Sequence, residues 1–278
     1  MQSPTIAALP DLPVETLGDG MDLVLLHGWG LHSEFFRPWL PHVLPQCRVH
    51  LIDLPGHGLS PAVTPFTLDT MAHAVAHSMA GVAPLYAVAG WSLGGAVALR
   101  MAIDFPDRIS HVVTLASAPR FLRADDWTHA TTPHALELLR SGLHRDYAGT
   151  LAQFFELNLA TRWPVLSATL KHLTGQRPPT QRIALDDGIA LTSGVDLRDE
   201  VARIRAPLLA ISGRLDRLSY SQSSAWLAAR TGGTHLELAH AAHAPHLSHG
   251  EETAAAVLAH LGVDSTPHRR NVAGAHHE

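Results

Sequence analysis

One short segment decides how this chain is organised: residues 85–95 read LYAVAGWSLGG. The apolar run Leu85–Ala89 predicts a buried strand, and Leu93–Phe105 predicts a helix that ends before a proline. Between them stands the pattern G-x-S-x-G, with Ser92 at its centre. A sharp turn from strand to helix holds such a serine in strained backbone above the sheet, and the glycines avoid collisions there. The segment therefore predicts that Ser92 is a nucleophile, the alternative being an ordinary helix N-cap.

Strands and helices alternate on both sides of this segment. Apolar runs that end in turn residues predict further strands at Met21–Leu26, Arg48–Asp53, Ile109–Ala116, Pro207–Ser212 and Thr234–Ala239. Helical spacing of apolar residues predicts helices at Leu68–Ala80, Tyr220–Arg230 and Glu251–Leu261. The alternation predicts an α/β fold with a mostly parallel sheet covered by helices on both faces.

The alternation stops between residues 119 and 196, where the chain is amphipathic and helical with no convincing buried strand. We interpret residues 119–196 as a helical cap inserted in one core, which residues 1–118 and 197–263 form. Residues 264–278 are polar and rich in histidine, which predicts a frayed tail.

Composition narrows the class of protein. The 278 residues include 46% hydrophobic and 16% charged residues, as in globular proteins, and the net charge of −5 predicts no general attraction to nucleic acid. The single cysteine excludes an internal disulfide. The N-terminus does not resemble a signal peptide, and no apolar run reaches the ~18 residues of a membrane span. We therefore expect a cytoplasmic protein.

Two later loops offer the partners that a serine nucleophile needs. With G-x-S-x-G in this context, an acidic residue and then a histidine are expected after late strands. Asp216 follows the strand Pro207–Ser212, and His243 follows the strand Thr234–Ala239. His243 has small neighbours that leave its ring room to reach Ser92. We predict that His243 is the general base and that Asp216 orients it.

Other residues compete for these roles. Asp125 and Asp126, just after the fourth strand, are alternative acids. Histidines spaced by three in the stretch 240–249 resemble a metal-binding helix face, but Pro245 makes a continuous helix unfavourable there. We therefore expect no metal site in this stretch.

The tetrahedral intermediate of acyl transfer needs two N–H donors. Leu93, directly after the nucleophile, is expected to supply one, and Trp29, in the loop after the first strand, the other. We expect His27 to hold that loop by hydrogen bonding. The segment from Asp53 to Gly58 predicts a shaped turn, since it lacks the G-x-G-x-x-G pattern.

Several motifs together resemble a known family, the pimeloyl-[acyl-carrier protein] methyl ester esterases of biotin synthesis, which have the α/β-hydrolase fold. The main ones are His27-Gly28-Trp29-Gly30-Leu31, Gly90-Trp91-Ser92-Leu93-Gly94-Gly95 and Ala241-Ala242-His243-Ala244-Pro245. Further matches are Asp53-Leu54-Pro55-Gly56, Ala116-Ser117-Ala118-Pro119, Asp126-Trp127, Val195-Asp196-Leu197-Arg198 and Ser248-His249. The resemblance runs from about Leu23 to His249 and is loosest in the cap.

The resemblance implies an esterase that removes the methyl group of a pimeloyl chain while the chain is thioester-linked to its carrier protein. It implies substrate-lining positions at Phe154, Leu157 and Asn158. It also implies that cap cations grip the acidic carrier, although each of them fits an ordinary solvated surface equally well. The cap contains Arg140, Arg145, Arg162, Lys171, Arg177 and Arg182.

The expected reaction is acyl transfer through Ser92, with no cofactor and no metal, in a monomer that binds neither nucleic acid nor membrane. A broad carboxylesterase with no carrier partner would use the same triad. So would a hydrolase of carbon–carbon bonds, and a non-catalytic ligand receptor can retain a triad as well. Contacts in the cap, which the sequence does not define, would separate these alternatives.

Overall fold

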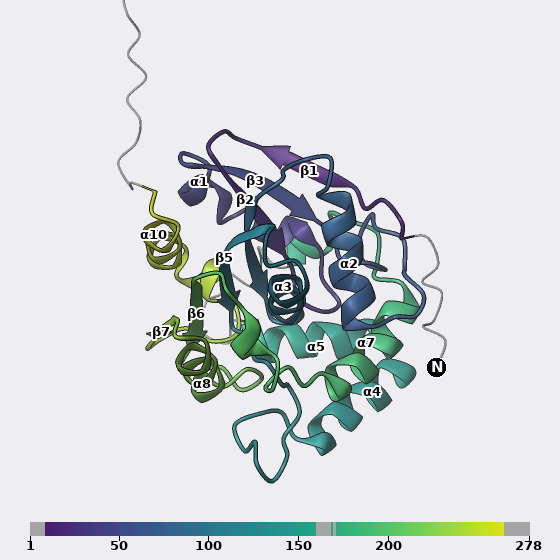
Figure 1. Ribbon diagram of the computed structural model, residues 1–278. Coiled ribbons are helices and arrows are strands. Elements are labelled where there is room, and N and C mark those ends of the chain that lie inside the picture. The colour runs from purple at the N-terminus through teal and green to yellow at the C-terminus, as the bar shows by residue number, and fades with distance from the viewer. Residues whose placement is uncertain (1–8, 160–167, 169–170, 264–278) are drawn as a thin grey trace, which may run out of the picture.

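A seven-stranded sheet forms the centre of the molecule in the computed structural model, which describes residues 9–159, 168 and 171–263 (Figure 1). The strands are β1 Val14–Leu17, β2 Met21–Leu26, β3 Cys47–Ile52, β4 Tyr86–Trp91, β5 Ile109–Leu115, β6 Leu208–Gly213 and β7 Thr234–Leu238. Their order across the sheet is β1-β3-β2-β4-β5-β6-β7. Every neighbouring pair is parallel except β1 and β3, so the prediction of a mostly parallel sheet is confirmed.

Strand β1 is the element of the sheet that sequence reasoning missed. It has four residues, Val14 pairs with Ile52, and Leu17 pairs with Val49. Its side chains are half-buried or exposed, because it lies at the edge of the sheet. A short edge strand has no buried apolar run, so its place depends on pairing with a distant strand.

Helices cover both faces of the sheet (Figure 1). One face packs against α2 Leu68–Ser78, α3 Leu93–Asp104 and α8 Ser221–Thr231, and the other against α1 Leu40–Val43 and α10 Gly250–His260. Side chains of β2 alternate between the two cores, since successive strand residues point to opposite faces: Leu23 and Leu25 lie in one, Val24 and Leu26 in the other. The short elements are η1 Ser33–Phe36, η2 Val201–Arg203 and α9 Pro245–Ser248.

The described residues of the predicted insertion are mainly helical. They include α4 Pro133–Arg145, α5 Tyr147–Leu159 and α7 Arg182–Gly194, which lie together below the sheet in Figure 1. The two ends of the insertion meet, because Arg120 and Asp196 form an antiparallel bridge and Leu197 N–H donates to Pro119 O at 2.9 Å. This contact supports the division at residues 119–196, which remains a proposal.

Side chains also hold the base of the insertion together. Arg198 pairs with Asp196 at 2.8 Å and with Asp126 at 2.9 Å, and its guanidinium lies 5.4 Å from the centre of the Trp127 ring. Hydrogen bonds from Arg198 and Arg120 lower the pKa of the Asp196 carboxyl to about 2. The carboxylate therefore stays charged, and the bridge persists, over the whole physiological pH range.

The remaining boundaries agree closely with the sequence analysis. Helix α2 ends two residues before the predicted end, and α8 is shifted by one residue. No helix in the described part of the chain is long and apolar enough to cross a membrane. The tail predicted at residues 264–278 lies outside the described residues.

Candidate active site

Ser92 occupies the turn between β4 and α3, with φ 54° and ψ −117°. That backbone conformation is unusual for a residue with a side chain, and the neighbouring glycines permit it. A Cβ on Gly90 would lie 2.1 Å from Gly94 O, and a Cβ on Gly94 would lie 2.2 Å from Leu26 O. Only glycine fits at either place, so the spacing of the motif follows from close packing of main chain.

The structure brings the three predicted side chains of the triad together. Ser92 Oγ lies 3.0 Å from His243 Nε2, and His243 Nδ1 lies 2.8 Å from Asp216 Oδ2. Both distances are within the range of a hydrogen bond, so the three side chains form one continuous hydrogen-bonded chain. Each residue follows the carboxyl end of a different parallel strand, β4, β6 or β7, and these ends share one edge of the sheet.

Main-chain donors hold the carboxylate of Asp216. Its Oδ1 accepts hydrogen bonds from Leu218 N–H at 2.8 Å and Ser219 N–H at 3.1 Å, which leaves Oδ2 for the histidine. The Asp216 side chain is fully buried. Asp125 and Asp126 are exposed, and Asp126 pairs with Arg198 instead. The geometry therefore selects Asp216 over its two rivals.

The stretch of closely spaced histidines forms no metal site within the described residues. Helix α9 begins at Pro245 and ends at Ser248, so the stretch is not one continuous helix. His240 is exposed, whereas His246 is 1% exposed and packs 4.9 Å from the Phe36 ring. Burial lowers the pKa of His246 to about 3, so this ring is neutral beside His243.

Two backbone donors lie next to Ser92. Among the described residues, neither Trp29 N–H nor Leu93 N–H donates to another atom. The Trp29 loop approaches the nucleophile closely, since a Cβ on Gly28 would lie 3.3 Å from Ser92 Cβ. Two free donors beside the serine are what an oxyanion hole requires.

Two buried histidines shape the loop that bears Trp29. His27 Nδ1 lies 2.8 Å from Gly28 O, and its Nε2 accepts from Leu54 N–H at 2.8 Å. His57 Nε2 accepts from Gly30 N–H at 3.2 Å. Burial lowers the pKa of His27 to about 3 and that of His57 to about 4, so both rings can accept these bonds. Sequence reasoning anticipated His27 but not His57.

The turn after β3 is organised by one carboxylate and is not a phosphate cradle. Asp53 Oδ1 accepts from Ser33 N–H at 2.7 Å, and its Oδ2 accepts from Leu59 N–H at 2.9 Å. Gly58 has φ 49°, and a Cβ there would lie 2.2 Å from Asp53 Oδ2. The Asp53 carboxylate accepts from main-chain donors of this turn and of η1, which agrees with the expected structural turn.

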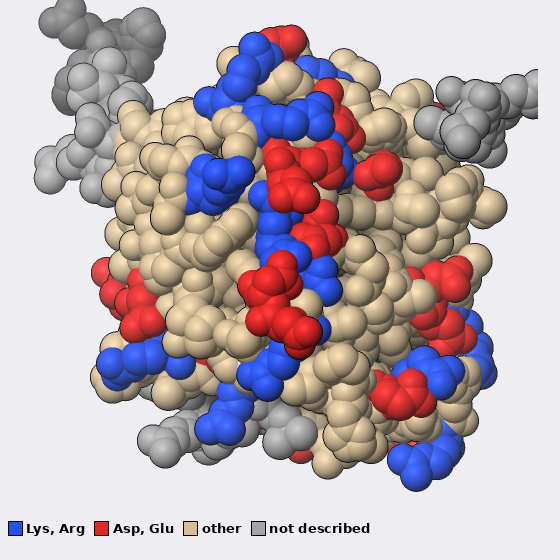
Figure 2. All heavy atoms as spheres, turned by 60° about the horizontal axis from the view of Figure 1, so that its bottom comes forward, with Lys and Arg blue, Asp and Glu red and all other residues tan. Residues whose placement is uncertain are grey.

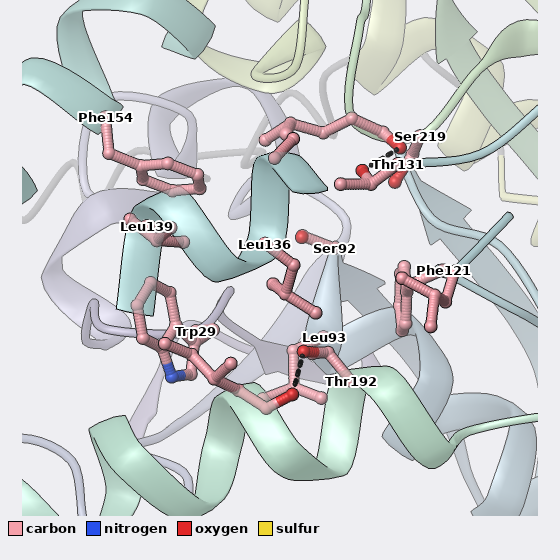
Figure 3. Close-up of a pocket in the computed structure, with 14 residues that line it drawn as sticks. Trp29, Ser92, Leu93, Phe121, Thr131, Leu136, Leu139, Phe154, Thr192 and Ser219 are labelled. Carbon is pink, nitrogen blue, oxygen red and sulfur yellow. Dashed lines mark hydrogen bonds between the residues drawn. The ribbon is translucent and has the colours of Figure 1, made fainter. Parts of the chain in front are cut away.

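A pocket of about 230 Å³ opens above Ser92 (Figure 3). Its lining is mostly apolar, and nine of its fourteen residues come from the insertion. The lining residues are Trp29, Ser92, Leu93, Phe121, Leu122, Thr131, Ala135, Leu136, Leu139, Phe154, Ile189, Thr192, Leu218 and Ser219. Amphipathic spacing indicated that the cap helices have an apolar face, but only their packing decides which apolar residues meet the serine.

The structure describes the side chain of only one of the three substrate-lining residues that the resemblance implies. Phe154 lines the pocket, and its ring meets the Trp29 ring edge-on with centroids 5.8 Å apart. Leu157 and Asn158 belong to α5, but their side chains lie outside the described residues. The Trp29 indole also donates to Ala184 O of α7 at 3.1 Å, so one aromatic residue joins the loop after β2 to two helices of the insertion.

The charge of the cap is mixed. Figure 2, which views the side where the cap lies, shows positive and negative side chains next to one another. Of the six cap cations named above, three are paired within the molecule: Arg140 with Glu137, Arg177 with Glu34 and Arg182 with Asp186. Arg145 and Lys171 make no ion pair within the described residues. Arg162 lies outside the described residues.

Comparisons with known proteins agree with this geometry. The family model for the alpha/beta hydrolase fold matches residues 23–250. An esterase from Exiguobacterium antarcticum superposes with a TM-score of 0.83 at 21% identity, covering 90% of this chain and 95% of that one. An enol-lactonase from Burkholderia xenovorans superposes with a TM-score of 0.80 at 22% identity, covering 92% and 99%. These structures are similar in fold.

Curated relatives are similar in sequence over almost their whole length. A pimeloyl-[acyl-carrier protein] methyl ester esterase of Stenotrophomonas maltophilia is 38% identical over 91% of this chain and 97% of the relative. A protein of the same name from Nitrosomonas europaea is 35% identical over 88% and 97%. The chain therefore belongs to the α/β-hydrolase fold family and, within it, to the family of these methyl ester esterases.

Proposed function

We propose that this protein is a serine esterase that hydrolyses the methyl ester of pimeloyl-[acyl-carrier protein], releasing methanol and the free carboxylate in biotin synthesis. The observation that carries the chemistry is the line from Ser92 Oγ through His243 to Asp216, with separations of 3.0 and 2.8 Å. The names of the relatives supply the substrate. A monomeric state, a cytoplasmic location and the lack of any cofactor stay predictions of the sequence.

The mechanism follows from the position of each group. His243 Nε2 takes the proton of Ser92, and the Ser92 oxygen attacks the ester carbonyl. The developing oxyanion accepts hydrogen bonds from the two free N–H groups of Trp29 and Leu93. Asp216 accepts the Nδ1 hydrogen and stabilises the imidazolium.

The second half of the reaction uses the same groups. Methanol leaves with the proton from His243, and an acyl chain remains esterified to Ser92. Water, deprotonated by His243, then attacks the acyl-enzyme carbonyl and releases the carboxylate. Protonation of His243 before the reaction removes the base, so activity should fall toward acid pH.

The pocket supports a long apolar acyl chain. Its walls of leucine, isoleucine, phenylalanine and tryptophan match a run of methylene groups, since burial of each is worth ~0.8 kcal/mol. Residues 119–196 supply nine of the fourteen residues that line the pocket, which supports the proposal that they are a cap over a separate catalytic core. A carrier protein would remain outside, with the chain passing beneath the cap.

The experiment is to incubate the protein with carrier-bound pimeloyl methyl ester and to follow loss of the methyl group by mass. The control is Ser92→Ala, which removes the nucleophile and leaves the pocket in place. We expect demethylation that depends on Ser92 and is faster than with the same methyl ester free of carrier. Equal rates on free and carrier-bound ester would favour a broad carboxylesterase. Ser92-dependent cleavage of carbon–carbon bonds in place of esters would reject the proposal.

A further inference from the structure

Trp91 stands directly before the proposed nucleophile, and its side chain is 1% exposed. Its indole Nε1–H donates a hydrogen bond of 2.6 Å to the carbonyl oxygen of His243. Among the described residues, this is the one hydrogen bond made to the main chain of His243. A side chain from β4 thus holds the loop that bears the proposed base.

The same side chain touches the other parts of the reaction centre. It belongs to the residue directly before Ser92, so the same turn bears the nucleophile and the group that holds the base. A Cβ on Gly28 would lie 3.8 Å from Trp91 Cδ2, which places the oxyanion loop against the indole. Nucleophile, base and oxyanion loop therefore share one rigid aromatic support.

Close packing keeps the indole in place. The His246 ring meets it at 4.7 Å between centroids and 64°, and the Phe35 ring lies 6.3 Å away. The loop around His243, in contrast, is built from Ala241, Ala242 and Ala244, whose side chains offer little surface to hold it. The hydrogen bond from Trp91 supplies a contact that these alanines cannot.

Burial alone does not explain this choice of acceptor. A buried indole N–H needs a partner, but any nearby carbonyl satisfies it. Trp39 donates to Gly250 O at 3.0 Å, and Trp127 donates to Arg120 O at 3.0 Å, both away from the triad. Trp91 differs from them because its acceptor belongs to the residue whose ring accepts the serine proton.

We infer that Trp91 is a positioning residue whose indole N–H fixes the separation of His243 and Ser92 during the reaction. The inference rests on the proposed triad mechanism but not on the proposed carrier substrate. Misplacing a reacting group by about 1 Å costs on the order of 100-fold in rate, so one hydrogen bond to the base can matter greatly for turnover.

Two substitutions distinguish the contribution of the indole N–H group from that of the size of the ring. Trp91→Phe keeps most of the aromatic surface and removes the donor. Trp91→His removes the outer ring, but its Nε2–H occupies the position of the indole N–H when the two five-membered rings are superposed. Activity is measured on a short-chain nitrophenyl ester, which needs the triad and no carrier, so failure of the carrier proposal would leave this test intact. Urea unfolding gives stability.

Stability and turnover are expected to rank the two variants in opposite orders. Trp91→Phe should be the more stable, and its kcat should fall on the order of 10- to 100-fold with KM within about twofold of wild type. Trp91→His should be less stable than Trp91→Phe but should have the higher kcat. A kcat for Trp91→Phe within about twofold of wild type, or at or above that of Trp91→His, would overturn the inference.

Trp39→Phe is the matched control, because it also removes a buried indole donor to a main-chain carbonyl. It should leave kcat unchanged. An equal loss of kcat in both phenylalanine variants would reduce the Trp91 bond to a general stabilising contact and overturn the inference. Should Trp91→Phe fail to fold, Trp91→His decides, since a loss beyond about 100-fold with the donor retained contradicts positioning by that donor.

Discussion

The edge of the sheet that bears the triad and the cap that covers it are held by different kinds of contact. Main-chain donors hold two members of the triad in place: Ser92 N–H donates to Leu115 O at 2.9 Å, and Leu218 N–H donates to Asp216 at 2.8 Å. The cap contacts the core largely through side chains, such as Arg177 with Glu34 at 2.6 Å. Reaction chemistry and substrate choice should therefore respond to different substitutions.

The largest expected effect is a loss of kcat from a substitution in the triad that leaves the cap unchanged. Asp216→Asn keeps the size of the side chain but presents an amide to His243 Nδ1, which favours the wrong tautomer. We expect kcat to fall on the order of 10⁴-fold on every ester tested, with the unfolding midpoint little changed. Wild-type turnover in a folded Asp216→Asn protein would refute the assignment of the acid.

A second effect concerns the stability of the core in acid. His27, His57 and His246 have pKa values lowered by burial to about 3, 4 and 3, whereas in the unfolded chain they regain ordinary values. Between pH ~6.5 and those values the unfolded state binds more protons than the folded state. The free energy of unfolding should therefore fall by ~1.4 kcal/mol for each histidine with every unit by which the pH is lowered in this window. Above that window the three groups add no pH dependence.

The variant His246→Leu tests the contribution of one of these three histidines to the pH dependence of stability. Both ring nitrogens of His246 lack a hydrogen-bond partner within the described residues, so leucine loses no bond there. Urea unfolding from pH 8 to 5 should give a shallower slope for this variant than for wild type. His172→Gln, an exposed cap position, is the control and should leave the slope unchanged. Parallel slopes for wild type and His246→Leu would contradict the buried neutral ring.

A smaller effect should separate substrates. Phe154→Ala opens the pocket wall beside Trp29, so it should lower kcat/KM for long acyl esters about 10-fold and leave short acetate esters nearly unchanged. Leu138→Ala, at a position 56% exposed on α4, is the control from the same cap. An equal loss on short and long esters would show that the cap also acts on the chemistry.

The smallest effect concerns the carrier. Arg145 is exposed and makes no ion pair within the described residues, so it is free to meet an acidic partner. Arg145→Ala should raise KM for carrier-bound ester about 2- to 5-fold at low salt, with the difference shrinking as salt rises. Arg140→Ala, whose side chain pairs with Glu137, should change KM less. A larger change for Arg140 would place the carrier elsewhere on the cap.

The sequence by itself determined the type of fold and the residues nearest the chemistry. Ser92, Asp216 and His243 each follow a buried apolar run, and the strand periodicity that marks such a run is a local property. Parallel strands end at a shared edge, so the order of motifs along the chain was enough to bring the three together. The same reasoning led to the proposal that Trp29 and Leu93 supply the oxyanion donors, because these donors belong to main chain next to the glycine turns.

Only the tertiary structure decided what surrounds these groups. The pairing of edge strand β1, the donor to His57, the acceptor of Trp91 and the walls of the pocket all depend on residues far apart in the chain. An amphipathic helix has an apolar face, but packing alone selects what that face meets. The same limit applies to three cap arginines, Arg140, Arg177 and Arg182. The sequence did not predict their ion pairs within the molecule, and these pairs make the three side chains less available to a carrier protein.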